Sequence, residues 1–212
     1  MIIKNKMSRI DNHDFLIHFT KPSGRYKDID IFSNIVHQSS LICGNGFIKG
    51  GECCICFTET PHTLLSHDKK YFSRYSPFGI MFQKDFIFNL GGRPVKYSTE
   101  DEYDLLPNEL KYRFVKMGLS SNPKIDFSWE REWRLRKESL NFTPEDAILI
   151  FPNKTIFQIF LDRLEIQISI EKDIKYEIYS SLGDSDLMET FIQDDIIKNG
   201  FNWKVIFLYD IL

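Results

Sequence analysis

Two neighbouring carboxylates form the most promising chemical group in this chain. The segment 127–136 reads Phe-Ser-Trp-Glu-Arg-Glu-Trp-Arg-Leu-Arg, which places Glu130 and Glu132 two residues apart among tryptophans and arginines. In a strand, residues i and i+2 point to the same face, so both carboxylates would project from one side of a sheet. Apolar neighbours and paired like charges raise carboxylate pKa values, whereas cationic neighbours lower them. This balance suits one glutamate to acid/base catalysis on a substrate hydroxyl. The competing interpretation is a surface strand whose glutamates pair with Arg131, Arg134 and Arg136.

A second group of candidates lies on two expected strands. His18 and Thr20 stand two apart on a first strand, so they share a face and can hydrogen-bond a sugar or an amide. Thr58 and Glu59 follow a buried strand at a turn, where binding groups are common in α/β proteins. The competing interpretations are a satisfied core histidine and ordinary turn chemistry.

A loop before the strand 78–82 combines a guanidinium with aromatic rings. Arg74 and Tyr75 precede Ser-Pro-Phe-Gly, a mixture that could grip a phosphate and stack on a heterocycle. The same aromatic residues could instead anchor the loop in the core. The chain contains no phosphate-cradling glycine loop, no nucleophile elbow and no zinc-binding His-Glu-x-x-His segment. Enzyme classes that need those motifs are disfavoured.

Charge and hydropathy limit the expected partners. A net charge of −3 over 212 residues argues against a nucleic-acid coat or a general membrane-surface binder. Two segments are nevertheless basic, 1–27 with six basic and two acidic residues and 111–137 with eight and three, which suggests a basic channel. No apolar run is long enough to span a membrane, and the first residues do not resemble a signal peptide. We therefore expect a cytoplasmic protein without membrane contact.

The cysteines are crowded in a way that does not resemble a disulfide framework. Cys53, Cys54 and Cys56 share one apolar segment, with Cys43 ten residues earlier. A zinc site with His62 or His67 is an alternative, but the usual two-residue gap between cysteine ligands is missing. We expect buried thiols and no metal.

Hydrophobic periodicity and turn residues predict one continuous α+β domain, residues 1–212. The expected strands are 15–20, 53–58, 78–82, 94–97, 147–151 and 203–209. The expected helices are 29–38, 84–89, 105–117 and 184–199, and the segment 155–181 is ambiguous between helix and strand. Short strands and loops of mixed length favour a split mixed sheet with peripheral helices over a regular doubly wound sheet.

A series of short motifs occurs in a recognisable order. They are His18-Phe-Thr20, Cys56-Phe-Thr58, Tyr75-Ser-Pro-Phe-Gly79, Pro94-Val-Lys-Tyr97 and Trp129-Glu-Arg-Glu-Trp-Arg134. This order resembles the AbiGi-type abortive-infection proteins of bacteria and, more distantly, the DarT-type ADP-ribosyltransferase toxins. The resemblance covers residues 14 to 152, and the carboxy-terminal part, 153–212, has none that is usable.

The resemblance implies a fold and a set of roles. The fold would be an ADP-ribosyltransferase-like split mixed or antiparallel sheet with peripheral helices, and NAD would be the substrate, with no metal required. His18 and Thr20 would hold NAD, with Thr58 as a further candidate for binding it. Glu132 would be catalytic, and Glu130 would position the acceptor. Arg74 resembles an arginine that follows an aromatic–proline segment in DarT-type enzymes, although here it precedes that segment, and Tyr75 would stack on nicotinamide.

The implied function is a toxin or phage-defence effector that transfers ADP-ribose from NAD to RNA or DNA, or to protein. An aligned carboxylate would stabilise the positive charge that develops on the ribose when the nicotinamide bond breaks. A cognate antitoxin protein is an expected partner. The alternatives are an NAD glycohydrolase and a non-catalytic antitoxin or binding module on the same fold. The enzymatic alternatives all require His18 and the acidic pair to meet in one cleft.

Overall fold

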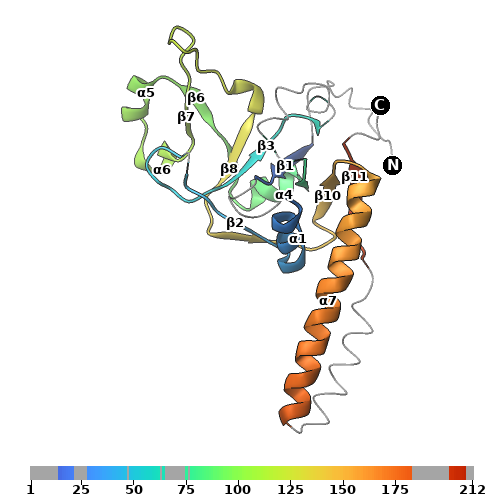
Figure 1. Ribbon diagram of the computed structural model, residues 1–212. Helices are drawn as coiled ribbons and strands as arrows, with labels where there is room; N and C mark the ends of the chain where they lie inside the picture. Colours follow the sequence, from blue (N-terminus) through green and yellow to red (C-terminus); the bar gives the residue numbers. More distant parts are fainter. Residues whose placement is uncertain are drawn as a thin grey trace, which may run out of the picture.

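The computed structural model describes residues 14–21, 28–46, 48–62, 64, 75, 77–182 and 201–208. Its centre is a seven-stranded mixed sheet with the strand order β11-β10-β4-β1-β3-β8-β5 (Figure 1). Every ladder in this sheet is antiparallel except that between β10 and β11, which is parallel. Its strands are β1 (Phe15–Phe19), β3 (Ile55–Thr58), β4 (Gly79–Gln83), β5 (Arg93–Pro94), β8 (Glu132–Leu135), β10 (Ala147–Phe151) and β11 (Lys204–Phe207).

The remaining elements lie around this sheet. Two small ladders are formed by β2 (Ser40–Ile42) with β9 (Ser139–Asn141), which is antiparallel, and by β6 (Lys96–Ser98) with β7 (Phe114–Lys116), which is parallel. The helices are α1 (Asp28–Gln38), α4 (Lys84–Asn89), α5 (Glu100–Asp104), α6 (Asn108–Lys111), the 3₁₀ helix η1 (Ser128–Glu130) and α7 (Lys154–Leu182). Figure 1 shows α7 running well beyond the sheet, with α5, α6, β6 and β7 gathered at the other end of the molecule.

Alternation along the strands gives the main sheet two apolar faces. On β1, Leu16 belongs to the larger buried cluster, whereas Ile17 and Phe19 belong to a smaller one. The larger cluster includes residues from α1, α4 and α7, so we call its side the helix face. The side with Ile17, Phe19, Met81 and Ile150 is called the second face. Each strand side chain can therefore be assigned to one face from its position along the strand.

Phenylalanine rings fill the helix face. Phe32 of α1 lies 5.3 Å from Phe78, 5.2 Å from Phe151 and 6.0 Å from Phe160, measured between ring centroids. These rings join α1, the sheet and α7 in one cluster, and aromatic pairs at such separations contribute beyond the area they bury. The high phenylalanine content of the chain is thus explained by a core built from ring contacts.

Most of the expected elements are present, with shifts of one or two residues at their ends. The expected strand 94–97 is divided at Val95 into β5 of the main sheet and β6 of the small parallel ladder. The predicted helix 105–117 is wrong: the chain forms α5 and α6 on either side of Pro107, and residues 114–116 form β7 beside β6. Proline removes a backbone donor, which breaks the helical period at this point. The ambiguous segment 155–181 is helical in α7. The predicted helix 184–199 lies outside the described residues.

We expect the Phe160→Ala substitution to lower the free energy of unfolding by about 3–5 kcal/mol, because the ring is fully buried among other rings. Ile159→Ala on the same helix is the matched control, since Ile159 is 40% exposed, and it should cost less than about 1 kcal/mol. Urea denaturation of both variants measures the difference. Equal losses would show that α7 does not pack on the sheet as described.

Candidate functional site

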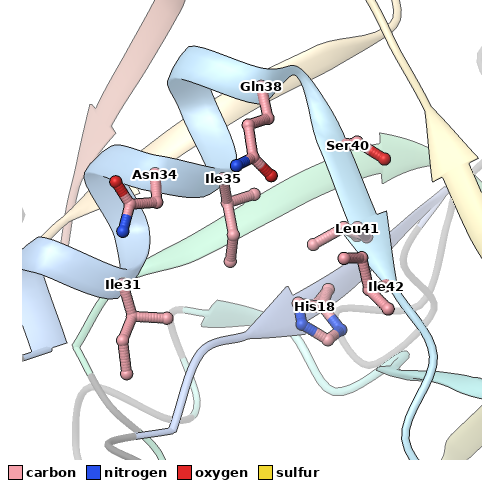
Figure 2. Close-up of a pocket in the computed structure, with 8 residues that line it drawn as sticks. All are labelled: His18, Ile31, Asn34, Ile35, Gln38, Ser40, Leu41 and Ile42. Carbon is pink, nitrogen blue, oxygen red and sulfur yellow. The ribbon is translucent and has the colours of Figure 1, made fainter. Parts of the chain in front are cut away.

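His18 lies on the helix face, beside a small open cavity. It alternates with Ile17 and Phe19 on β1, and its ring makes an edge contact with Phe57 at 6.0 Å. The cavity has a volume of about 250 Å³. We call it the His18 pocket; it is lined by His18, Ile31, Asn34, Ile35, Gln38, Ser40, Leu41 and Ile42 (Figure 2). α1 and β2 form its walls, and β1 supplies the histidine (Figure 2). Apart from histidine its lining carries no ionisable side chain.

The histidine is held by the neighbouring strand. Its Nδ1 lies 2.8 Å from the carbonyl oxygen of Cys56, so a proton on Nδ1 is donated to that oxygen. Burial lowers the pKa of His18, with the hydrogen bond to Cys56 acting in the opposite direction and the charge of Lys21 adding to the lowering. The ring is therefore neutral at pH 7. Thr20 is also committed to the backbone, since its hydroxyl donates to the carbonyl of Phe78 at 3.3 Å.

Glu132 lies on the second face. Its neighbours on β8, Trp133 and Leu135, belong to the cluster of the helix face, so Glu132 and Arg134 project the other way. Arg134 grips both oxygens of Glu132, with Nε at 2.8 Å from one and Nη2 at 3.2 Å from the other. Only 14% of the Glu132 side chain and 5% of the Arg134 side chain are exposed. This buried bidentate pair is the ion pairing that the competing interpretation of the sequence expected, but it lies in the interior rather than on the surface.

Arg134 connects the pair to the rest of the fold. Its Nη1 donates to the carbonyl oxygens of Tyr112 at 2.6 Å and Phe114 at 3.1 Å, which tie β8 to the segment carrying β7. Burial lowers the pKa of Arg134, but the hydrogen bonds and charge of Glu132 outweigh this effect and the pKa is raised. The guanidinium therefore stays charged, and it has a structural function.

Two further side chains surround the Glu132 carboxylate. The backbone N–H of Glu132 donates to the Tyr97 hydroxyl at 2.9 Å, and burial, strengthened by the Glu132 and Glu130 carboxylates, raises the pKa of Tyr97 to about 12. Cys56 hydrogen-bonds to the carboxylate, and burial together with Glu132 raises the pKa of its thiol to about 12. Both groups are protonated at neutral pH, so neither provides a nucleophile.

Glu130 is not on the same strand as Glu132, which corrects the expectation of a paired display. It ends the 3₁₀ helix η1, and Arg131 follows with a φ of 46° before β8 begins. This left-handed residue interrupts the alternation that would have placed both carboxylates on one strand face. The Thr58 hydroxyl donates to the carbonyl oxygen of Glu130, so Thr58 holds the turn in place.

The aromatic part of the expected site also lies on the second face. Tyr75 contacts Phe19 at 5.3 Å and Trp129 at 6.2 Å between ring centroids. It belongs with Trp129 to the apolar residues packed on the smaller cluster, which supports the alternative in which aromatic residues anchor this loop. Arg74 lies outside the described residues.

The expected site is therefore divided between two faces. His18 and Thr20 lie on the helix face, whereas Thr58 and Glu132 face the other way, as the pairing of Thr58 with Ile17 and Glu132 shows. The strands themselves are close, since β3 alone separates β1 from β8. A single cleft lined by His18 and the Glu132 carboxylate is not formed by the described residues.

The basic side chains of the segment 111–137 are in part engaged by other groups of the described structure. Four of its eight basic side chains are in ion pairs: Arg134 with Glu132, Arg136 with Glu52, Lys116 with Glu100, and Lys124 with Asp126. Another, Arg113, donates to the carbonyl of Pro94 at 2.8 Å. These contacts use part of the positive charge of the segment, and a nucleic-acid partner stays a prediction from the sequence.

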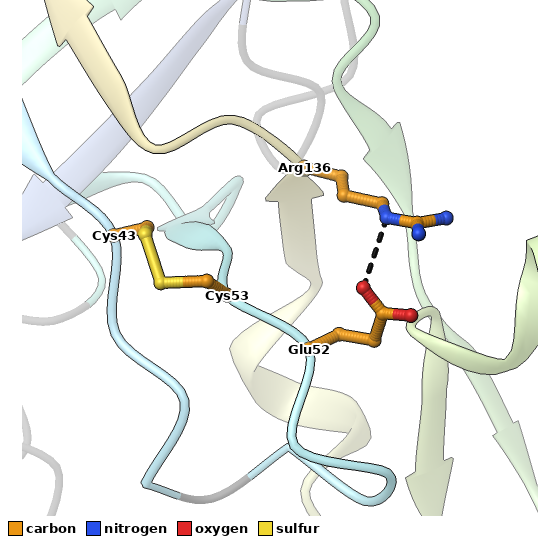
Figure 3. Close-up of a disulfide and its surroundings, with 4 residues drawn as sticks. All are labelled: Cys43, Glu52, Cys53 and Arg136. Carbon is orange, nitrogen blue, oxygen red and sulfur yellow. Dashed lines mark ion pairs between the residues drawn. A yellow bond between two sulfur atoms is a disulfide. The ribbon is translucent and has the colours of Figure 1, made fainter.

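A disulfide joins Cys43 to Cys53, which corrects the expectation that all four cysteines are thiols (Figure 3). The intervening glycine-rich segment turns at Gly50 and Gly51, both at positive φ, and brings the two Cα atoms to 5.3 Å. Cys54 and Cys56 remain thiols, as expected. Beside the disulfide, Glu52 pairs with Arg136 at 2.9 Å (Figure 3).

Comparisons with known proteins give no family for this chain: no family model, no curated protein and no solved structure matches it. Within the described ranges, no cluster of three or more histidine, cysteine or acidic side chains is arranged to hold a metal ion. In the same ranges no helix combines the length and apolar character needed to cross a membrane.

We expect Glu132→Ala to lower the free energy of unfolding by about 3–5 kcal/mol, because it leaves the buried Arg134 guanidinium without its counter-ion. Glu52→Ala removes the partner of the more exposed Arg136 and should cost no more than about 1 kcal/mol. Chemical denaturation at pH 7 compares the two. A loss below that of the control would mean that the Glu132–Arg134 pair does not stabilise the fold.

We also expect His18 to make the protein less stable in mild acid. Because its folded pKa lies below the ordinary value of 6.5, the unfolded chain binds more protons in this range, and the unfolding free energy falls as the pH drops from about 6.5 to the folded pKa. His18→Asn keeps a donor near the Cys56 carbonyl but does not titrate, so its stability should fall less between pH 7.5 and pH 5. Parallel slopes for the two proteins would contradict this assignment.

Proposed function

We propose that this protein is a non-catalytic binding module, of the antitoxin-like kind, on an ADP-ribosyltransferase-like sheet. The single observation that supports this proposal best is the position of Glu132. The carboxylate expected to act on NAD has both oxygens bound by Arg134 and faces away from His18. A catalytic carboxylate needs a free edge toward the substrate, and here that edge is used to hold the fold.

The chemistry around the carboxylate supports the same conclusion. Both oxygens of Glu132 accept hydrogen bonds from a guanidinium that itself donates to two carbonyl oxygens, so the carboxylate belongs to a fixed structural network. Tyr97 and Cys56, the nearest ionisable neighbours, stay protonated because their pKa values are raised to about 12. The proposed partner is a protein, because half of the basic side chains of the segment 111–137 are already in ion pairs.

An ADP-ribosyltransferase remains the second candidate, for one reason. The strands that carry His18, Thr58 and Glu132 are consecutive in the sheet, in the order β1-β3-β8. The resemblance to DarT-type enzymes concerns these same motifs. Transfer to nucleic acid or protein, or hydrolysis of NAD, would then require a rearrangement that turns the histidine and the carboxylate toward one cleft.

We expect the purified protein to release no nicotinamide from NAD above the rate of the buffer, with or without RNA, DNA or protein as acceptor. Glu132→Gln and Glu130→Gln should give the same background, and circular dichroism must show that both variants are folded. Labelled NAD followed into each acceptor fraction measures transfer directly. Turnover by the wild type that Glu132→Gln abolishes would overturn the proposal in favour of the transferase.

Expression in a bacterial host separates a toxin from a binding protein. We expect induced wild-type protein to leave growth unchanged, as a non-catalytic module should. Growth inhibition that disappears in folded Glu132→Gln would support a toxin. A protein partner that copurifies with the wild type should also copurify with Glu132→Gln, since the partner surface does not use the buried carboxylate.

A further inference from the structure

We propose that the Cys43–Cys53 disulfide is a redox switch that sets the accessibility of the His18 pocket. The bond lies beside one wall of that pocket, β2, and beside β3, the strand that holds the histidine. Cys43 directly follows β2, and Ser40, Leu41 and Ile42 of that strand line the pocket (Figures 2 and 3). Cys53 lies two residues before β3, whose Cys56 carbonyl holds the His18 ring. One covalent bond thus links the pocket wall to the strand that orients its histidine.

Within the described residues, β2 packs mainly on α1 and β9 rather than on β3. β2 belongs to the small ladder with β9 and not to the main sheet. Next to the disulfide, Gly44 and Cys54 form an isolated bridge with hydrogen bonds of 3.0 and 3.1 Å. Leu41 is buried in the core of the helix face with 1% of its surface exposed, whereas Ile42 leaves 70% exposed, so the end of β2 next to Cys43 is the less firmly packed part of the wall. Breaking the disulfide therefore releases the Ile42–Cys43 end of this wall from β3, while Leu41 stays in the core.

The disulfide is suited to reaction with an external reductant. Both cysteines are partly exposed, whereas the neighbouring Cys54 is buried and its thiol pKa is raised to about 11, chiefly by burial. Because the thiolate is the form that attacks a disulfide, Cys54 does not exchange with Cys53 at neutral pH. The oxidised pair persists until a dithiol reductant reaches it.

The reaction balances with a dithiol of the thioredoxin or dithiothreitol class. One thiolate of the reductant attacks a sulfur of the disulfide, forming a mixed disulfide and releasing the other cysteine as a thiolate. The second thiol of the reductant then displaces the remaining cysteine. The protein gains two electrons and two protons as two thiols, and the reductant leaves as a disulfide. Reduction then allows the Ile42–Cys43 end of β2 to move from β3, which widens the pocket and makes it more accessible to water and to ligands.

The titration of His18 reports the opening independently of any enzymatic activity. In the oxidised protein, burial holds the pKa of His18 below its ordinary value. After reduction with dithiothreitol, and in the Cys43→Ser/Cys53→Ser variant, we expect the pKa measured by NMR of the ring Cε1–H to move upward toward 6.5. Modification of His18 by diethyl pyrocarbonate, followed by mass spectrometry, should become several-fold faster. His18→Asn assigns the resonance among the five histidines.

Cys54→Ser is the matched control, because it removes a neighbouring thiol and keeps the disulfide. It should titrate like the oxidised wild type and respond to dithiothreitol in the same way. An unchanged His18 pKa and modification rate after reduction would overturn the proposal. Global unfolding on reduction, detected by circular dichroism, would also overturn it by showing that the bond is a structural staple. If the double serine variant does not fold, the reduced and oxidised wild-type proteins provide the same comparison.

Discussion

The bidentate pair between Arg134 and Glu132 is the interaction on which this architecture depends most. The guanidinium uses its fork to bind a carboxylate on its own strand and two carbonyl oxygens before and within β7. It thereby fixes β8, next to the edge strand β5 of the main sheet, against the small parallel ladder of β6 and β7. Removing either charge would leave the other one buried without a partner, which is far costlier than losing an exposed pair.

The same interaction determines how the chain's most suggestive motif must be interpreted. A glutamate and an arginine two residues apart on a strand point to the same face of the sheet. In a closed interior they pair with each other, so this carboxylate is already occupied by the guanidinium. His18 lies on the opposite face, where the Cys56 carbonyl orients its ring and burial lowers its pKa. Each of these residues has thus a complete local explanation that involves no substrate.

Regular periodicity predicted most of the fold. The strands near 15–20, 78–82 and 147–151 and the helix 29–38 are present because alternation and helical spacing reflect burial directly. The failure at 105–117 came from apolar residues that fit a helix locally but pack between separate short elements around Pro107. The spacing of apolar residues within 105–117 cannot reveal this arrangement. Whether residues 114–116 form a strand depends on their pairing with β6, which lies before α5 and α6 in the chain.

The site was harder to predict for a similar reason. The prediction that Glu130 and Glu132 share one face assumed a continuous strand. Arg131, whose backbone is in the left-handed conformation, interrupts that strand. Arg134 was visible in the sequence as an ion-pair partner, but its burial depends on the carbonyls of Tyr112 and Phe114, which no local pattern indicates. Likewise, the partner of Cys43 depends on a turn at two adjacent glycines, whereas simple crowding of cysteines suggested only thiols.

One margin of the main sheet ends in β5, a strand of two residues that includes Pro94. Since proline has no amide hydrogen, this border offers an incomplete row of donors to an incoming backbone. Growth of the sheet by strand addition, whether through self-association or capture of an extended segment, is therefore discouraged at this border. Any such recruitment would have to proceed from the other margin, where the parallel strand β11 occupies the outermost position.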